Sequence, residues 1–108
     1  MDTWCPITAE ELQSLIDEQL RECTDAEREI FERYRVLLRP TPLERFGKPD
    51  SVFVVAQRGN EVMYYEDIEE GFNLSPLTAD GRIAQRWCNQ DELTHALFRW
   101  QNRPEETR

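Results

Sequence analysis

Apolar residues recur at intervals of three and four along the first third of the chain, which is the spacing of one face of an α-helix. The segment 8–23, TAEELQSLIDEQLREC, opens with Thr8 and carries Glu11 three positions later, the pair that forms a capping box. The segment 24–38, TDAEREIFERYRVLL, repeats the same pattern. We therefore expect two amphipathic helices joined by a sharp turn.

The hydrophobic period changes to two after a proline-rich stretch. Residues 39–50 contain three prolines and a glycine, and we expect them to form an ordered crossover. Residues 51–65 form two alternating runs around Gly59-Asn60, a turn sequence typical of two-residue β-hairpins. This segment therefore predicts a first hairpin.

A second hairpin and a third helix complete the pattern. Residues 72–77 and 82–87 flank an Asp-Gly turn, and residues 89–100 carry a helical apolar stripe that follows a cap at Asn89. The predicted order is ααββββα. We expect an α+β fold in which an antiparallel meander of about four strands packs against two N-terminal helices and one C-terminal helix. One domain, 1–108, should include a frayed tail at 101–108.

Both faces of the first hairpin are apolar. In the register that the turn predicts, Val55 faces Tyr64, and these two residues share a face with Phe53 and Val62. Helices packed on the sheet can cover the opposite face. The hairpin is therefore either sandwiched between two layers or has a second face kept for a partner.

Charge separates the chain into blocks. The net charge is −9, with −8 in residues 1–32, +4 in residues 33–60, −6 in residues 61–80 and +1 in the remainder. A negative field repels nucleic acid and anionic membranes, and it attracts cationic partners. We therefore expect a protein partner with a basic surface, no nucleic acid and no membrane.

Composition indicates a cytoplasmic and reduced protein. The sequence shows no apolar stretch typical of a signal peptide or a membrane span, and its three cysteines lack paired metal or redox spacing. Cys88 precedes the expected third helix, where a thiol can become reactive, but Trp87 beside it favours a structural role. Twelve of the thirteen basic residues are arginine, a bias expected of GC-rich coding DNA and therefore of a bacterium.

The stretch 64–73, YYEDIEEGFN, is the densest group of carboxylates in the chain. It lacks the alternating oxygen ligands and the central glycine of a calcium loop, so we predict no metal site and no cofactor. A solvated turn is one interpretation. The preferred one is the rim of a partner-binding surface whose centre is the second face of the hairpin. That predicted surface comprises Phe53, Val55, Val62, Tyr64, Glu66, Asp67, Glu69 and Glu70.

Three classes of function follow from these features. The first is a protein-binding module, and an inhibitor or immunity-type protein would be one form of it. The second is a self-associating module or homodimer, in which the apolar hairpin face pairs with its own copy. The third is a carboxylate-dependent hydrolase or isomerase that uses Glu66 or Glu70 with Tyr64 and His95. We predict that the chain is not an enzyme, because the sequence shows no recognisable pair of nucleophile and base and no set of metal ligands.

Overall fold

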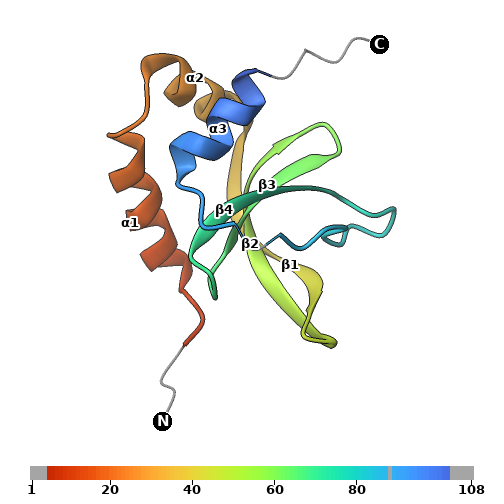
Figure 1. Ribbon diagram of the computed structural model, residues 1–108. Helices are drawn as coiled ribbons and strands as arrows, with labels where there is room; N and C mark the ends of the chain where they lie inside the picture. Colours follow the sequence, from red (N-terminus) through yellow and green to blue (C-terminus); the bar gives the residue numbers. More distant parts are fainter. Residues whose placement is uncertain (1–4, 88, 103–108) are drawn as a thin grey trace.

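The computed structural model describes residues 5–87 and 89–102. Its helices lie on one side of a curled antiparallel sheet (Figure 1). The elements are α1 (Ala9–Leu20), α2 (Asp25–Tyr34), β1 (Arg35–Arg45), β2 (Lys48–Arg58), β3 (Glu61–Glu66), β4 (Gly71–Pro76) and α3 (Leu93–Gln101). The strands lie in the order β1-β2-β3-β4. The α+β fold, the meander and the element order ααββββα are as predicted.

Local capping chemistry fixes the starts of α1 and α2. The Thr8 hydroxyl accepts a hydrogen bond from the Glu11 backbone N–H at 3.1 Å, and the Thr8 N–H donates to the Glu11 carboxylate at 2.9 Å. Thr24 and Glu27 make the same reciprocal pair. Each box satisfies amide groups that the first turn of a helix cannot pair internally.

The second helix ends earlier than predicted, because a strand replaces its last residues and much of the expected crossover. α2 ends at Tyr34, and β1 runs from Arg35 to Arg45 as an edge strand. Pro40 and Pro42 fit there because an edge strand has one side on which no N–H needs a partner. The register of β1 shifts between Arg35 and Arg39, and Leu37 in this irregular stretch is 92% exposed.

The predicted fourth strand, 82–87, is wrong. Within the described residues this segment makes one isolated bridge, Leu77 to Ile83, and then continues as an irregular chain. The Ile83 N–H also donates to the Pro42 carbonyl at 2.9 Å. The segment 77–87 therefore crosses from β4 to the β1 edge and covers the sheet face that the helices leave open.

Two apolar cores result, one on each face of the sheet. The larger core packs the three helices against the sheet, with Leu12, Phe31, Leu97 and Trp100 among its buried members. The smaller core lies beneath the segment 77–87. Its members are Leu43, Val52, Val54, Val62, Tyr64 and Ile83, with Val36 and Leu77 packed against them.

A β-bulge changes which residues of β2 share a face. Ala56 pairs with Met63, as the turn predicts, but Val54 then pairs with Tyr64 because the register shifts at Val55. Phe53 and Val55 consequently pack in the helix-side core. The prediction that they share a face with Tyr64 is wrong.

The third helix begins later than the sequence suggested. Its cap is Glu92 rather than Asn89, and the Glu92 N–H donates to Nδ1 of His95 at 3.1 Å. The predicted tail from 101 falls mainly on 103–108, outside the described residues. No helix in the described part of the chain combines the length and apolar character needed to cross a membrane.

Candidate functional site

The turn between β3 and β4 contains the carboxylate stretch, and its backbone is unusual at Glu70. β3 ends at Glu66, and the Glu70 N–H donates to the Glu66 carbonyl at 2.7 Å. Glu70 has a φ of 63°, a left-handed conformation that is uncommon outside glycine. Gly71 follows because a Cβ there would lie 2.0 Å from the Asn89 carbonyl oxygen. The glycine permits close approach of the chain that leads into α3.

Glu66 lies in the interior rather than on a rim. Its side chain is 0% exposed, and its carboxylate binds Arg45 and Arg86, each at 2.8 Å. The Ile68 N–H donates to the same carboxylate at 2.8 Å. A buried charge needs such partners because removing it from water costs several kcal/mol. Glu66 therefore stabilises the structure of this region. The prediction that Glu66 contacts a partner at the surface is wrong.

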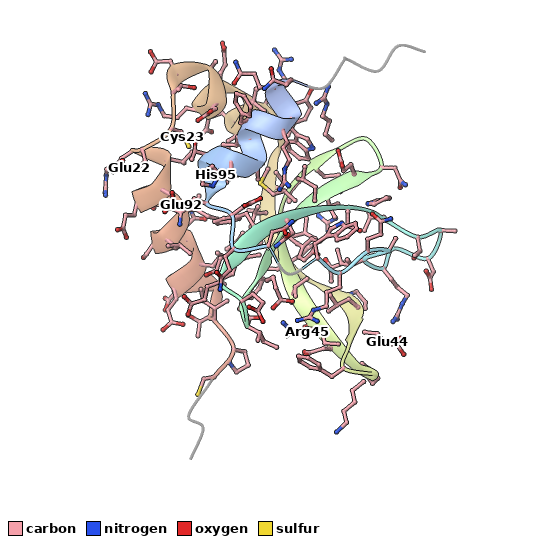
Figure 2. All side chains as sticks on the ribbon, viewed as in Figure 1. Glu22, Cys23, Glu44, Arg45, Glu92 and His95 are labelled. Atoms are coloured by element: carbon pink, nitrogen blue, oxygen red, sulfur yellow. The ribbon has the colours of Figure 1, made fainter. Side chains whose placement is uncertain are left out.

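Arg45 connects the β1–β2 hairpin to this turn. Besides Glu66 it binds Asp67 and Asp50, both at 2.9 Å. Burial lowers the pKa of Arg45, but the hydrogen bond with Asp67 and the charges of Glu66 and Asp67 outweigh burial, so the pKa lies above its ordinary value. Figure 2 shows Arg45 within the end of the sheet, whereas its neighbour Glu44 extends to solvent.

Phe46 is the feature of this region that sequence reasoning missed. It occupies the tip of the β1–β2 hairpin with a φ of 54°, and it is 74% exposed. The Arg86 guanidinium lies 4.9 Å from the centre of its ring, and Arg86 is itself held by Glu66. A bulky residue with positive φ is strained, and strain of this kind collects at functional positions. The available signal was Phe-Gly at a turn where Asn-Gly is typical.

The predicted centre of the partner surface is not exposed. Val55, Val62 and Tyr64 are fully buried, and Phe53 is half-buried. The Tyr64 hydroxyl accepts from the Trp87 N–H at 2.7 Å and donates to the Gln85 carbonyl at 3.1 Å, which fixes the covering segment. The hairpin face predicted for self-pairing is therefore occupied by this chain.

The outer carboxylates of the turn remain near the surface. Glu70 is exposed and Glu69 is half-buried, whereas the Asp67 side chain is only 9% exposed. Arg45 joins this turn to the hairpin that carries Phe46. We use the name tip surface for Phe46, Asp67, Glu69, Glu70 and Arg86.

The enzyme hypothesis needs Tyr64 and His95 close together, and the structure separates them. Tyr64 and Glu66 lie at the second face of the sheet, whereas His95 is exposed on α3, which packs on the first face. Figure 2 shows His95 in the helical layer and Arg45, the partner of Glu66, at the far end of the sheet. Among residues 5–87 and 89–102, no group of three His, Cys, Asp or Glu side chains is placed to hold a metal ion.

The described cysteines differ in their surroundings. Cys23 is buried, and burial, followed by the charge of Glu27, raises the pKa of its thiol. A raised thiol pKa lowers the fraction of nucleophilic thiolate. Cys5 is exposed. Cys88 lies outside the described residues, so its structural role stays a prediction.

The tip surface is thus the arrangement best suited to recognition. It combines an exposed aromatic ring, against which Arg86 lies, with the carboxylate turn, and ion pairs of the buried Glu66 connect the two. Aromatic anchors surrounded by polar groups are common at protein interfaces. Comparison with known proteins assigns no family, since no family model, no curated protein and no solved structure matches the chain.

Proposed function

We propose that this protein is a cytoplasmic protein-binding domain, of the inhibitor or immunity type, that engages a partner with a basic surface through the tip surface. The observation that carries the proposal is Phe46, an aromatic residue that is both strained and 74% exposed. Neither property benefits the isolated fold, because left-handed geometry costs a bulky residue roughly 1–2 kcal/mol. Both properties suit an anchor that enters a partner's pocket.

The setting of Phe46 supports a role in binding. Arg86 stacks on the ring and is fixed in turn by the buried Glu66, so the ring is ordered before a partner arrives. An anchor that is already ordered loses little conformational entropy on binding, which increases affinity. Phenylalanine with a cation against one face still presents its edge and its other face to a partner.

The charge of the carboxylate turn, rather than that next to Phe46, supports a basic partner, since Arg86 lies against the Phe46 ring. Glu70 is exposed beside Asp67 and Glu69, and α1 and α2 carry most of the largest acidic block of the sequence. Opposite charge at the rim of an interface favours the correct orientation and suppresses wrong partners. Small acidic proteins that inhibit basic enzymes use complementarity of this kind.

An affinity experiment with the native source tests this proposal. Wild-type protein immobilised as bait should capture a basic protein, identified by mass spectrometry, and Phe46→Asn should lose it. The complex should weaken by about 2 kcal/mol if Phe46 is a hot spot, which is close to 30-fold in Kd. The free energy of unfolding should not fall, because asparagine tolerates positive φ better than phenylalanine does.

Phe98→Asn is the matched control. Phe98 is also an exposed phenylalanine, at 59%, but it lies on α3 in the helical layer. This variant should capture the same protein as the wild type. Equal capture by the wild type and Phe46→Asn would refute the assignment of the tip surface.

A further inference from the structure

A small pocket lies next to the tip surface, on the helix side of the sheet. Its volume is about 170 Å³, and Asp67 of the carboxylate turn forms part of its wall. The segment before α1 closes one side of it, where the Ile7 N–H donates to the Asp67 carboxylate at 3.1 Å. The lining includes Pro6, Ile7, Pro40, Phe53, Tyr65 and Asp67.

The wall combines apolar surface with one carboxylate. Prolines, Ile7 and two aromatic residues supply the apolar part, and Asp67 supplies the charge. The Asp67 carboxylate is held from two sides, by the Ile7 N–H and by Arg45. Its position is therefore fixed without a ligand, as in preorganised binding sites.

Three carboxylates of the turn act on Tyr65 in the pocket wall. Burial, followed by the charges of Glu70, Asp67 and Glu66, raises the pKa of Tyr65 to about 12. Arg45 and Arg86 oppose this field, but they already pair with three carboxylates, those of Asp50, Glu66 and Asp67. The network therefore keeps an excess of negative charge, which favours a cation in the pocket.

The volume of the pocket and the combination of apolar and charged groups in its wall select the kind of cation. A volume of 170 Å³ is below the roughly 300 Å³ at which pockets for drug-sized ligands begin, so the pocket suits one side chain. Lysine combines a flexible aliphatic stem with a compact ammonium group, whereas arginine favours planar two-point pairing with a carboxylate. The rings of Phe53 and Tyr65 add surfaces to which a cation is attracted.

We propose that this pocket receives a lysine side chain of the partner protein, with its methylene stem against Pro40 and Phe53 and its ammonium group at Asp67. The inference rests on the proposed function, because the lysine belongs to the basic partner. It adds a second point of attachment beside Phe46. A chain of ion pairs connects the two points, because Arg86 against Phe46 binds Glu66, Glu66 binds Arg45, and Arg45 binds Asp67.

A titration with n-butylammonium, a mimic of the lysine side chain, tests the pocket without a partner. Amide resonances of Ile7, Phe53 and Asp67 should shift saturably in ¹H–¹⁵N NMR spectra. The uncharged n-butanol should bind at least ten times more weakly. Asp67→Asn should remove this preference for the cation, and Glu70→Asn, which keeps a residue tolerant of positive φ, should reduce it two- to threefold.

Controls separate loss of the pocket from loss of the fold. Glu44→Gln changes an exposed carboxylate at the hairpin and should leave butylammonium binding unchanged. If Asp67→Asn unfolds the chain, the Glu70→Asn comparison still decides the matter. Equal binding of butanol and butylammonium by the wild type, or no shift at the pocket amides, would overturn the inference.

The outcome can be distinguished from failure of the proposed function. If butylammonium does not bind but Phe46→Asn abolishes partner capture, the lysine pocket is wrong and the tip surface stands. If butylammonium binds selectively but capture ignores Phe46, the proposed function is wrong. A captured partner whose Kd rises about tenfold with Asp67→Asn and is unchanged by Glu44→Gln would support both.

Discussion

Glu66 and Arg45 illustrate how one buried carboxylate affects the stability of the end of the molecule that carries the tip surface. Glu66 is fully buried, and Arg45 is its partner from a strand about twenty residues earlier in the chain. Arg45→Met should lower the free energy of unfolding by about 3 kcal/mol, because it leaves Glu66 with only part of its compensation. Urea denaturation measured by circular dichroism checks this value.

The neighbouring exposed position supplies the control for that measurement. Glu44→Gln should change the free energy of unfolding by no more than about 0.5 kcal/mol, as is usual for surface substitutions. A loss below about 1 kcal/mol for Arg45→Met would show that Arg86 and water satisfy Glu66 without Arg45.

At the scale of single residues, the sequence indicates on which face of the sheet a side chain lies, but not whether that face is exposed to solvent. Alternation along β3 puts Glu66, its last residue, on the same face as Val62 and Tyr64. The exposure of that face depended on where the segment 77–87 lies, which no local pattern encodes. The four carboxylates consequently looked equivalent, although Glu66 is buried and Glu70 is exposed.

At the scale of elements, structure set by short-range contacts was predictable. Thr8 and Thr24 cap their helices through bonds to residues three positions away, and the Gly59-Asn60 turn joins β2 to β3. The start of β1 was not predictable in this way, because its apolar residues also continue the helical stripe of α2. The bulge at Val55 depends on packing between strands and has no signature in the sequence.

The segment 77–87 should behave as a separable cover on the second face. Tyr64→Phe removes the hydroxyl that accepts from the Trp87 N–H and donates to the Gln85 carbonyl. We expect a cost of about 1–2 kcal/mol, because backbone groups then lose their partner. The Trp87 amide should exchange its hydrogen faster in native-state measurements, whereas the Leu97 amide in α3 should change only as much as global stability does. Equal acceleration at both amides would show that the cover opens only with the whole fold.

At the scale of the whole molecule, the acidic helices and the exposed Phe46 lie in different parts of the structure. α1 and α2 carry most of the acidic block of residues 1–32, whereas Phe46 lies in the turn of the β1–β2 hairpin at the other end of the sheet (Figure 1). Charges distant from the contact act through the long-range field, and this field weakens over about 10 Å at 0.1 M salt. The helical carboxylates should therefore affect the encounter with a partner more than the final complex.

This separation leads to a kinetic prediction for the captured partner. Replacing Glu10, Glu18, Glu22 and Glu29 by glutamine removes four exposed charges that lie outside the capping boxes and the Asp25–Arg28 and Glu32–Arg35 ion pairs. Association at low salt should slow by about tenfold, and its dependence on salt should flatten, because steering acts on the association rate. The dissociation rate should stay within about twofold of the wild type.

Phe46→Asn should show the opposite pattern, with faster dissociation and nearly unchanged association, because an anchor acts only after contact. Biosensor measurements at two ionic strengths distinguish these patterns. An association rate that changes neither with salt nor with the four substitutions would show that the acidic residues of the helices do not steer the partner.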